Sequence, residues 1–286
     1  MEESRRGRTG RNGDFVREQA LALARSQADP AQRLNLLREY LQACVLRSLH
    51  ESEAFASVAF VGGTALRFLH GLPRFSEDLY FSLESADGYQ PVRLPEKMKR
   101  DLVAAGFDIS MKLNDRKTVH SAWIGFAGLL KPAGLSGMAD QKLSIKIEVD
   151  TRPPAGAVAA TDLVNRHMIF AVRHYDLPSL MAGKIHALVT RRYPKGRDWF
   201  DLMWYRAQRP PVEPNLLLLQ NALDQTEFAG RFQAAEWRRA ARERLDSLDP
   251  ETLRQDAAPF LERPADARWL DRESLRQVIE TREGAP

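Results

Sequence analysis

The spacing of apolar positions changes along the chain and indicates two kinds of secondary structure at its start. Over residues 15–50 apolar side chains recur every three or four positions, and Asp29-Pro30 interrupts the pattern. This spacing predicts two amphipathic helices. The period then shortens to a continuous apolar run at 57–61, which predicts a buried strand that turns directly into a helix over 64–70.

Further along, alternation predicts a sheet and then gives way to helical spacing. Four more strands are expected at 79–83, 107–111, 122–126 and 143–149, with a helix over about 95–105. After Pro153-Pro154 the pattern is helical over 177–192, 198–207 and most of 214–283. The sequence therefore predicts an α+β protein. We expect a solvated tail over 1–13, a mixed sheet with helices over 14–152 and a helical domain over 153–286.

Composition narrows the class of protein. The 286 residues are 44% hydrophobic and 28% charged, and no apolar run approaches the ~18 residues of a membrane span. The first thirteen residues hold four arginines and no apolar stretch, unlike a signal peptide. Cys44 is the only cysteine, so an internal disulfide and a thiolate metal cluster are excluded. We therefore expect a cytoplasmic protein with no membrane partner.

The net charge of +4 is too small to indicate nucleic-acid binding unless the positive charge is concentrated locally. Two such concentrations exist, at 191–197 and 231–244, and either could bind phosphates. The second is also explained by a solvated helix face with pairs such as Arg239 with Glu243. Their members are Arg191, Arg192, Lys195 and Arg197, and Arg231, Arg238, Arg239, Arg242 and Arg244.

Two segments carry residues suited to phosphate and metal chemistry. Gly62 and Gly63 open the predicted helix at Thr64, where backbone N–H groups and the helix N-terminus can approach a phosphate. Asp78 enters the next strand after a turn that contains Ser76, and a carboxylate there is a candidate Mg²⁺ ligand. Both observations have a structural alternative, since glycine and serine also serve ordinary turns.

Further candidates lie on the last predicted strand and on two later helices. Glu148 belongs to a polar strand face and would supply a second metal carboxylate if its strand neighbours Asp78. Lys184 interrupts an apolar helical stripe, a partly buried placement that suits phosphate binding and also allows the ammonium to reach outward to water. Asp198, with Asp201 three residues later, fits either an active-site acid or a helix N-cap.

Together these segments resemble one family. Residues 60–79 resemble the first motif of the AbiEii/AbiGii nucleotidyltransferase-like toxins, related to the MenT-type toxins, and 146–150, 180–187 and 197–202 match its other motifs in order. The resemblance, over about 30–207, implies a polymerase-β-like nucleotidyltransferase fold followed by a helical domain. It also implies Mg²⁺, a nucleoside triphosphate (NTP) substrate, an acceptor that in some relatives is the 3′ end of tRNA, and a partner antitoxin.

The resemblance also assigns roles to individual residues. It implies metal binding by Asp78 and Glu148 with Ser76 beside them, and a catalytic set of Asp78, Lys184 and Asp198. Nucleotide contacts would come from Gly62, Gly63, Thr64, Ser76, Lys184 and Arg197.

One position departs from the family's first motif, which usually ends Asp-Leu-Asp. Here Tyr80 takes the place of the second aspartate, and a neutral phenol is a poor Mg²⁺ ligand. Two hypotheses follow: an enzyme that works with the remaining acids, or a catalytically impaired protein that keeps its nucleotide or antitoxin contacts.

Overall fold

The computed structural model describes residues 15–91 and 93–281 and divides into two compact units. Unit 1 comprises the described part of Met1–Leu69, Phe75–Arg152 and Thr161–Arg173. Unit 2 comprises His70–Arg74, Pro153–Ala160 and the described residues from His174 onward. The short segment His70–Arg74 thus belongs to unit 2, although the residues on both sides of it belong to unit 1.

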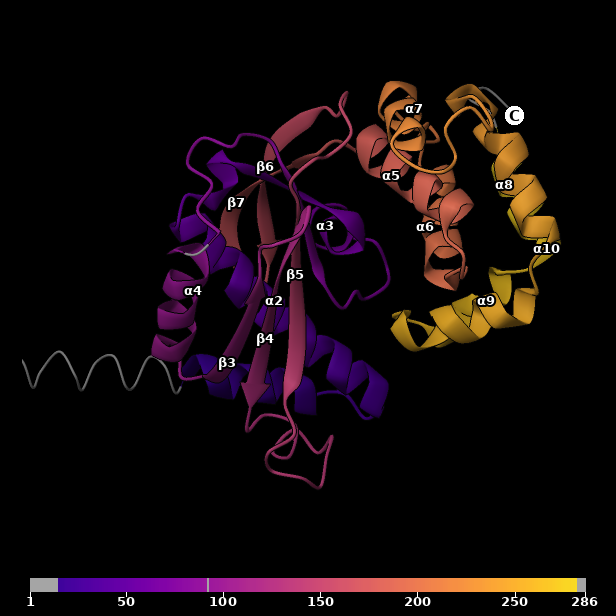
Figure 1. Ribbon diagram of the computed structural model, residues 1–286. Helices are drawn as coiled ribbons and strands as arrows, with labels where there is room; N and C mark the ends of the chain where they lie inside the picture. The colour runs from indigo at the N-terminus through magenta and orange to yellow at the C-terminus, as the bar shows by residue number, and fades with distance from the viewer. Residues whose placement is uncertain (1–14, 92, 282–286) are drawn as a thin grey trace, which may run out of the picture. The chain divides into compact units, whose positions relative to one another are not determined.

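Unit 1 is built on a mixed sheet. Within the described residues this sheet has seven strands in the order β3-β4-β5-β2-β1-β7-β6 (Figure 1). β2 runs parallel to β5 and antiparallel to β1, and β4 runs antiparallel to both β3 and β5. A mixed sheet with helices confirms the predicted fold class. The strands are β1 (Val58–Val61), β2 (Leu79–Leu83), β3 (Asp108–Asn114), β4 (Val119–Ala127), β5 (Leu143–Asp150), β6 (Ala159–Arg166) and β7 (Met168–Tyr175).

The helices of unit 1 begin where the sequence pattern predicts a break. Residues 15–25 are helical, and α2 (Pro30–Glu51) starts at a proline that needs no N–H partner, capped by the Asp29 carboxylate. The remaining helices are η1 (Ala54–Ala56), α3 (Gly62–His70) and α4 (Arg93–Ala104). The α3 helix starts two residues earlier than predicted because the glycine pair forms its first turn.

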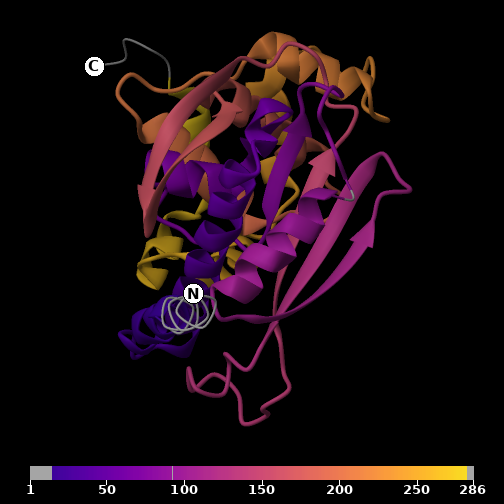
Figure 2. The ribbon, with the colours of Figure 1, turned by 90° about the vertical axis from the view of Figure 1, so that its left-hand side faces the viewer.

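One face of the sheet is apolar and covered, and the other is polar. β5 alternates buried Leu143, Ile145, Ile147 and Val149 with half-buried or exposed polar residues. The side chains that meet this apolar face come from α2 and α4, which pack against each other (Figures 1 and 2). On α2, Cys44 is buried, and burial raises the pKa of its thiol to about 12, as expected for a packing residue.

The strands β6 and β7 are not predicted by the alternation. Leu163 and Ile169 are each 70% exposed, so their apolar side chains do not mark a buried face. The two strands join at His167, whose positive φ of 62° is unusual for a residue other than glycine. β7 alternates buried and more exposed residues, whereas β6 buries only Val164, so β6 lacks the one consistently buried face on which periodicity depends.

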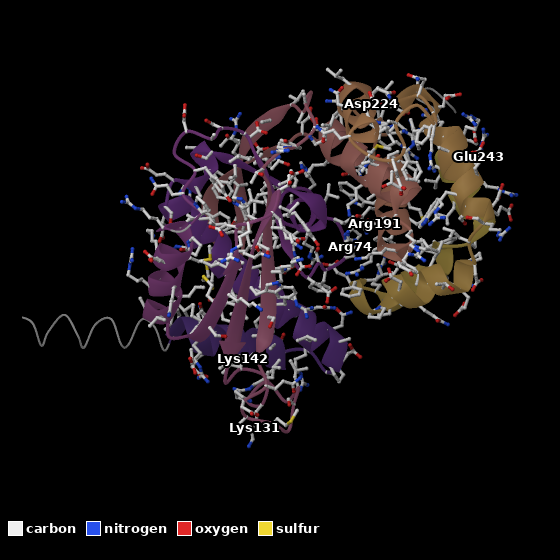
Figure 3. The ribbon with its side chains drawn as sticks, viewed as in Figure 1. Arg74, Lys131, Lys142, Arg191, Asp224 and Glu243 are labelled. Carbon is white, nitrogen blue, oxygen red and sulfur yellow. The ribbon has the colours of Figure 1, made fainter. Side chains whose placement is uncertain are left out.

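Unit 2 is mainly helical. Its helices are α5 (Leu177–Thr190), α6 (Gly196–Ala207), α7 (Leu216–Asp224), α8 (Trp237–Asp246), α9 (Pro250–Ala257) and α10 (Arg272–Glu280), with short 3₁₀ turns η2 (Ala234–Glu236), η3 (Ala258–Phe260) and η4 (Pro264–Trp269). Asp224 at the end of α7 and Glu243 on α8 are exposed (Figure 3). In the part of the chain that the structure describes, no helix is both long and apolar enough to cross a membrane.

Two helical glycines of unit 2 should respond oppositely to alanine. A Cβ on Gly196 would lie 1.8 Å from the carbonyl oxygen of Leu253, so Gly196→Ala should lower the free energy of unfolding by about 2–3 kcal/mol. Gly183 on α5 is exposed with nothing within 4 Å of its Cβ position, so Gly183→Ala should raise stability by up to about 1 kcal/mol. Urea unfolding of both variants measures these changes. Equal changes in the free energy of unfolding would contradict the prediction.

A buried charge cluster supports unit 1. The Glu39 side chain is 3% exposed and pairs with buried Arg67. Its carboxylate also lies 2.7 Å from His167 Nε2 and 3.3 Å from Arg166 Nη1. Burial alone would raise the pKa of Glu39. The hydrogen bond with His167 and the charges of Arg67 and Arg166 outweigh burial and lower that pKa to about 2.

This cluster predicts a pH dependence of stability. Because the folded pKa of Glu39 lies below the ordinary value of 4.5, its contribution of about 3 kcal/mol is present above pH 4.5 and is lost as the pH falls toward 2. Glu39→Gln should remove this part of the acid dependence. The measurement is urea unfolding at pH 7 and pH 3.5. The control is Glu96→Gln, which replaces an exposed glutamate and should leave the acid dependence of stability unchanged. The same loss of stability between pH 7 and pH 3.5 in all three proteins would contradict the assignment of this acid dependence to Glu39.

Candidate functional site

The polar face of unit 1 gathers four side chains on two neighbouring strands. In the parallel pair, Tyr80 of β2 lies opposite Glu148 of β5, and Asp78 comes two residues before Tyr80. Lys146 lies two residues before Glu148. Strand neighbours are about 4.8 Å apart and alternate residues share a face. The four side chains therefore form a small polar quadrilateral, and the prediction that the Glu148 strand neighbours Asp78 is confirmed.

Each carboxylate of the quadrilateral has a partner on its own strand. The Tyr80 hydroxyl donates to Asp78 Oδ2 at 3.2 Å, and Lys146 Nζ lies 2.6 Å from Glu148 Oε1. Burial raises the pKa of Asp78 above its ordinary value, while the Tyr80 hydrogen bond opposes that rise and the charge of Glu77 adds to it. Asp78 is therefore a desolvated carboxyl whose protonation depends on its immediate neighbours.

The glycine turn lies directly beside this quadrilateral. Gly62 follows β1 with φ of +82°, and a Cβ there would lie 3.3 Å from Cδ2 of Tyr80. Gly63 and Thr64 are buried, and the Thr64 hydroxyl donates to the backbone oxygen of Asp78 at 2.5 Å. The turn therefore lets the chain pass close to the tyrosine ring and fixes the backbone of Asp78.

The approach to Asp78 is also fixed from α2. The buried Gln42 side chain donates to the backbone oxygens of Ser76 and Glu77 at 3.0 and 2.9 Å. Ser76 itself is half-buried. The turn 76–78 is thus held by Gln42 on one side and by Thr64 on the other, which pre-positions Asp78 at the start of β2.

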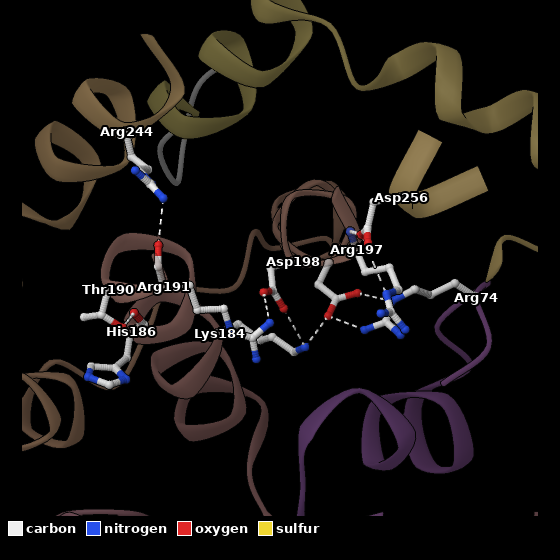
Figure 4. A network of polar contacts seen from close by, with 10 residues as sticks. Arg74, Lys184, His186, Thr190, Arg191, Arg197, Asp198, Arg244 and Asp256 are labelled. Atoms are coloured by element: carbon white, nitrogen blue, oxygen red, sulfur yellow. Dashed lines mark hydrogen bonds and ion pairs between the residues drawn. The ribbon is translucent and has the colours of Figure 1, made fainter. Parts of the chain in front are cut away.

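The other predicted site residues belong to unit 2, where Lys184 joins two helices. Lys184 Nζ on α5 lies 3.1 Å from Asp198 Oδ1 and 2.8 Å from Asp201 Oδ2, both on α6 (Figure 4). Arg191 Nη1 reaches Asp198 Oδ2 at 2.7 Å, and Arg74 binds both oxygens of Asp201 at 2.6 Å. Three cations thus surround two carboxylates, which leaves this Lys184 cluster with one excess positive charge.

In the Lys184 cluster, the pKa of the buried Asp201 depends on its charged neighbours. Asp201 is 0% exposed and Arg74 is 3% exposed. Burial by itself would raise the pKa of Asp201, but the charges of Arg74 and Lys184 and their hydrogen bonds hold it below its ordinary value. The Lys184 side chain is 15% exposed, so it has the partly buried position that the sequence predicts.

Asp198 does not cap its helix. The N-cap of α6 is Lys195, and Asp198 sits in the first turn with its carboxylate on Lys184 and Arg191. The N-cap interpretation is therefore wrong, because the close packing of Gly196 on Leu253 starts the helix two residues earlier. Arg197 is held separately: its backbone N–H donates to Asp256, and its guanidinium lies 3.9 Å from the ring centroid of Phe260.

Most arginines of the later basic run have acidic partners. The predicted pair of Arg239 with Glu243 is present at 3.0 Å, and Arg242 reaches Glu280 at 2.5 Å. Arg238 reaches Glu213 at 2.5 Å. The helix-face explanation is confirmed for Arg239, whereas Arg238 and Arg242 pair with residues outside their own helix.

Comparison with known proteins identifies the family. The family profile described as "Nucleotidyl transferase AbiEii toxin, Type IV TA system" matches residues 44–280. The chain belongs to the AbiEii nucleotidyltransferase toxin family. An AbiEii chain of a type IV toxin–antitoxin system has an antitoxin as partner, and the family's activity implies an NTP substrate and a divalent metal.

One solved structure supports the fold of this AbiEii chain, and a second gives a lower score. A protein of H. pylori assigned as a nucleotidyltransferase superposes with a TM-score of 0.50 at 17% identity, covering 82% of this chain and 92% of that one. JHP933 from Helicobacter pylori gives a TM-score of 0.46 at 17% identity, with 85% and 90% coverage. No curated protein matches the chain.

The polar quadrilateral offers few ligands for a divalent metal. Across residues 15–91 and 93–281, no group of three or more His, Cys, Asp or Glu side chains is placed to hold a metal ion. Asp78 and Glu148 nevertheless share one face of adjacent strands. Mg²⁺ in nucleotide enzymes commonly takes one or two carboxylates and fills its other positions with water and substrate phosphates. The pair therefore fits a Mg²⁺ that arrives with a triphosphate.

Two residues of these clusters were not proposed from the sequence as site residues: Arg74 and Lys146. Lys146 lies within a matched motif, so alternation on its strand could have found it. Arg74 lies 127 positions from Asp201, and only folding brings the two side chains together.

Proposed function

We propose that this AbiEii protein transfers nucleotidyl units from an NTP to an RNA acceptor in the cytoplasm, with the 3′ end of tRNA as the first acceptor to test. The observation that carries this proposal is the pairing of Asp78 and Glu148 on adjacent strands beside the glycine turn that opens α3. Carboxylates for a metal and a helix N-terminus for phosphates are the two elements that triphosphate chemistry needs.

Each residue has a distinct part in this proposal. Asp78 and Glu148 would hold Mg²⁺, which supplies charge stabilisation for the triphosphate and the departing pyrophosphate. Ser76 would lie beside them. The backbone of Gly62, Gly63 and Thr64 would contact phosphates, and the Thr64 hydroxyl positions Asp78. The acceptor hydroxyl attacks the α-phosphorus, pyrophosphate leaves, and one of the strand carboxylates takes the hydroxyl proton.

For the cations of unit 2 we propose phosphate contacts. Lys184 pairs with Asp198 and Asp201, and a partly buried ammonium interacts with phosphate with little screening. Asp198 would position Lys184 in this scheme, and Arg197 would add a further nucleotide contact.

The test is label transfer. The purified protein is incubated with each labelled NTP, Mg²⁺ and total tRNA, with and without the cognate antitoxin. We expect label on RNA from at least one NTP, and less of it with the antitoxin. No transfer from any of the four NTPs to tRNA or to total cellular RNA would reject the proposal.

A second candidate function follows from the hydrogen bond between Tyr80 and Asp78. Both carboxylates of the quadrilateral already have partners, the phenol for Asp78 and the ammonium of Lys146 for Glu148. A protein whose acids are internally satisfied can bind nucleotide or antitoxin without transferring anything. Calorimetry distinguishes the two functions, since triphosphate binding that is independent of Mg²⁺ favours the binding protein.

Substitution of Tyr80 gives a graded prediction. Tyr80→Asp adds a carboxylate oxygen beside Asp78, so the Mg²⁺ concentration for half-maximal transfer should fall by about tenfold. Tyr80→Phe is the control that keeps the ring and removes the donor. It should leave the Mg²⁺ requirement unchanged, and because the Tyr80 hydrogen bond lowers the pKa of Asp78, it should move the acid limb of the pH–rate profile to higher pH.

The activities of the Tyr80 variants also distinguish a nucleotidyltransferase from a binding protein. Transfer by Tyr80→Asp alone, with none by the natural protein, would establish the impaired binding protein. Equal Mg²⁺ requirements for all three proteins would show that position 80 does not contribute to metal binding.

A further inference from the structure

A hollow on unit 2 combines aromatic and cationic side chains. Its volume is about 340 Å³, within the range of sites that bind small organic ligands. The segment after α7 and the α8 helix supply the side chains that matter for binding, which are Phe228, Arg231, Phe232, Arg239, Glu243 and Arg244. We call this set the aromatic–arginine hollow.

Among the residues that the structure describes, two arginines of the hollow have no carboxylate partner. Arg239 is paired with Glu236 and Glu243, at 3.1 and 3.0 Å. Arg231 has no ion-pair partner within the described residues, and its guanidinium lies 4.7 Å from the ring centroid of Phe228. Arg244 donates only to backbone oxygens, and in the described part of the chain its buried Nε has no hydrogen-bond partner. A buried donor without a partner is costly unless a ligand satisfies it.

Arg244 links the hollow to the loop between α5 and α6. Arg244 Nη2 donates to the backbone oxygens of Arg191 at 2.7 Å and Arg192 at 3.3 Å, which fixes the start of this loop (Figure 4). Tyr193 follows with 73% of its surface exposed, and the Arg192 guanidinium lies 5.3 Å from its ring centroid. The Arg191 side chain binds Asp198, so the same loop joins the hollow to the Lys184 cluster.

The chemistry of these groups selects a ligand with flat aromatic rings and phosphates. Aromatic side chains stack on bases of any sequence, and unpaired arginines bind the intervening phosphates. Double-stranded nucleic acid hides its base faces, whereas a single strand presents them. An acidic peptide would satisfy the arginines but would leave the half-buried rings of the hollow and the exposed ring of Tyr193 without flat partners.

We infer that the aromatic–arginine hollow binds one nucleotide of a single-stranded RNA, with its base against Phe228 and Phe232 and its phosphate at Arg231 and Arg244. The Arg192–Tyr193 pair contacts the next nucleotide. That this RNA is the acceptor of nucleotidyl transfer rests on the proposed function; the binding itself does not.

The test measures binding by the full chain, independently of catalysis. The probe is a fluorescently labelled single-stranded RNA of about ten nucleotides, followed by anisotropy at several salt concentrations. Phe228→Ala and Arg231→Ala should each weaken binding by roughly tenfold, and Arg231→Ala should reduce the salt slope by about one. Exposed Arg231 tests the site without risk to the fold.

A matched control exists in the same unit. In η4 the Arg268 guanidinium lies 4.9 Å from the ring centroid of Trp269, which is 50% exposed, but this pair does not line the hollow. Arg268→Ala removes the same charge as Arg231→Ala, and Trp269→Ala removes an exposed ring. Both controls should bind the RNA as the natural protein does.

The outcomes separate this inference from the proposed function. RNA binding that is absent, unchanged in both hollow variants, or weakened equally by the Arg268 control would overturn the inference. Loss of antitoxin binding with intact RNA binding would also overturn it and make the hollow a protein interface. RNA binding that depends on the hollow in a protein without transfer activity would uphold the inference and reject the proposed function.

Discussion

Replacement of Asp78 by asparagine is expected to lower nucleotidyl transfer by about 10²–10³-fold while the fold stays intact. The backbone that carries Asp78 is fixed from two sides, since its own oxygen accepts the Thr64 hydroxyl and Gln42 holds the turn that precedes it. Asparagine keeps the size of the side chain and an oxygen for the Tyr80 hydroxyl. It removes the negative charge that a metal and a triphosphate require.

The measurement is the rate of label transfer to RNA at saturating NTP and Mg²⁺. Asp140→Asn is the matched control, because Asp140 is an exposed aspartate of the same unit, and it should transfer at the natural rate. Urea unfolding should give similar stability for both variants and the natural protein. Full activity of Asp78→Asn would remove the central residue of the proposed site and the proposal with it.

Replacement of Arg74 by alanine should lower the free energy of unfolding by about 3 kcal/mol. Arg74 binds both oxygens of Asp201, and both side chains are almost fully buried. Without the guanidinium, the fully buried Asp201 depends on Lys184, which also pairs with Asp198. A buried charge that loses its partner destabilises far more than the intact pair stabilises.

The control is Arg263→Ala, which breaks an exposed ion pair with Asp266 and should change stability by less than about 1 kcal/mol. The pH dependence gives a second check. The folded-state pKa of Asp201 is below its ordinary value, so its stabilising contribution is present at neutral pH and is lost as the pH falls below about 4. The destabilisation by Arg74→Ala should therefore be smaller at pH 3 than at pH 7. Equal losses of unfolding free energy at the two pH values would count against an electrostatic cause.

Local patterns predicted most of the secondary structure around the site. Strict alternation over 143–149 and β-propensity over 79–83 gave the two strands that carry Glu148 and Asp78, because one face of each is consistently buried. The Asp29-Pro30 break and the glycine pair at 62–63 marked helix starts through backbone chemistry that needs no distant partner. The β6 strand escaped prediction because it buries only Val164 and exposes Leu163, which leaves no one-sided pattern.

The sequence by itself thus determined the fold class, the family and the order of the motifs, since these depend on neighbouring residues and local spacing. Only the tertiary structure decided which partners the charged groups have. It paired Arg74 with Asp201, 127 positions away, and made Asp198 a partner of Lys184 where local rules allowed a helix cap. It also left Arg231 without a carboxylate in the described residues while three nearby arginines acquired one. Charge pairing acts through space, so it is fixed only when packing sets the distances and excludes water.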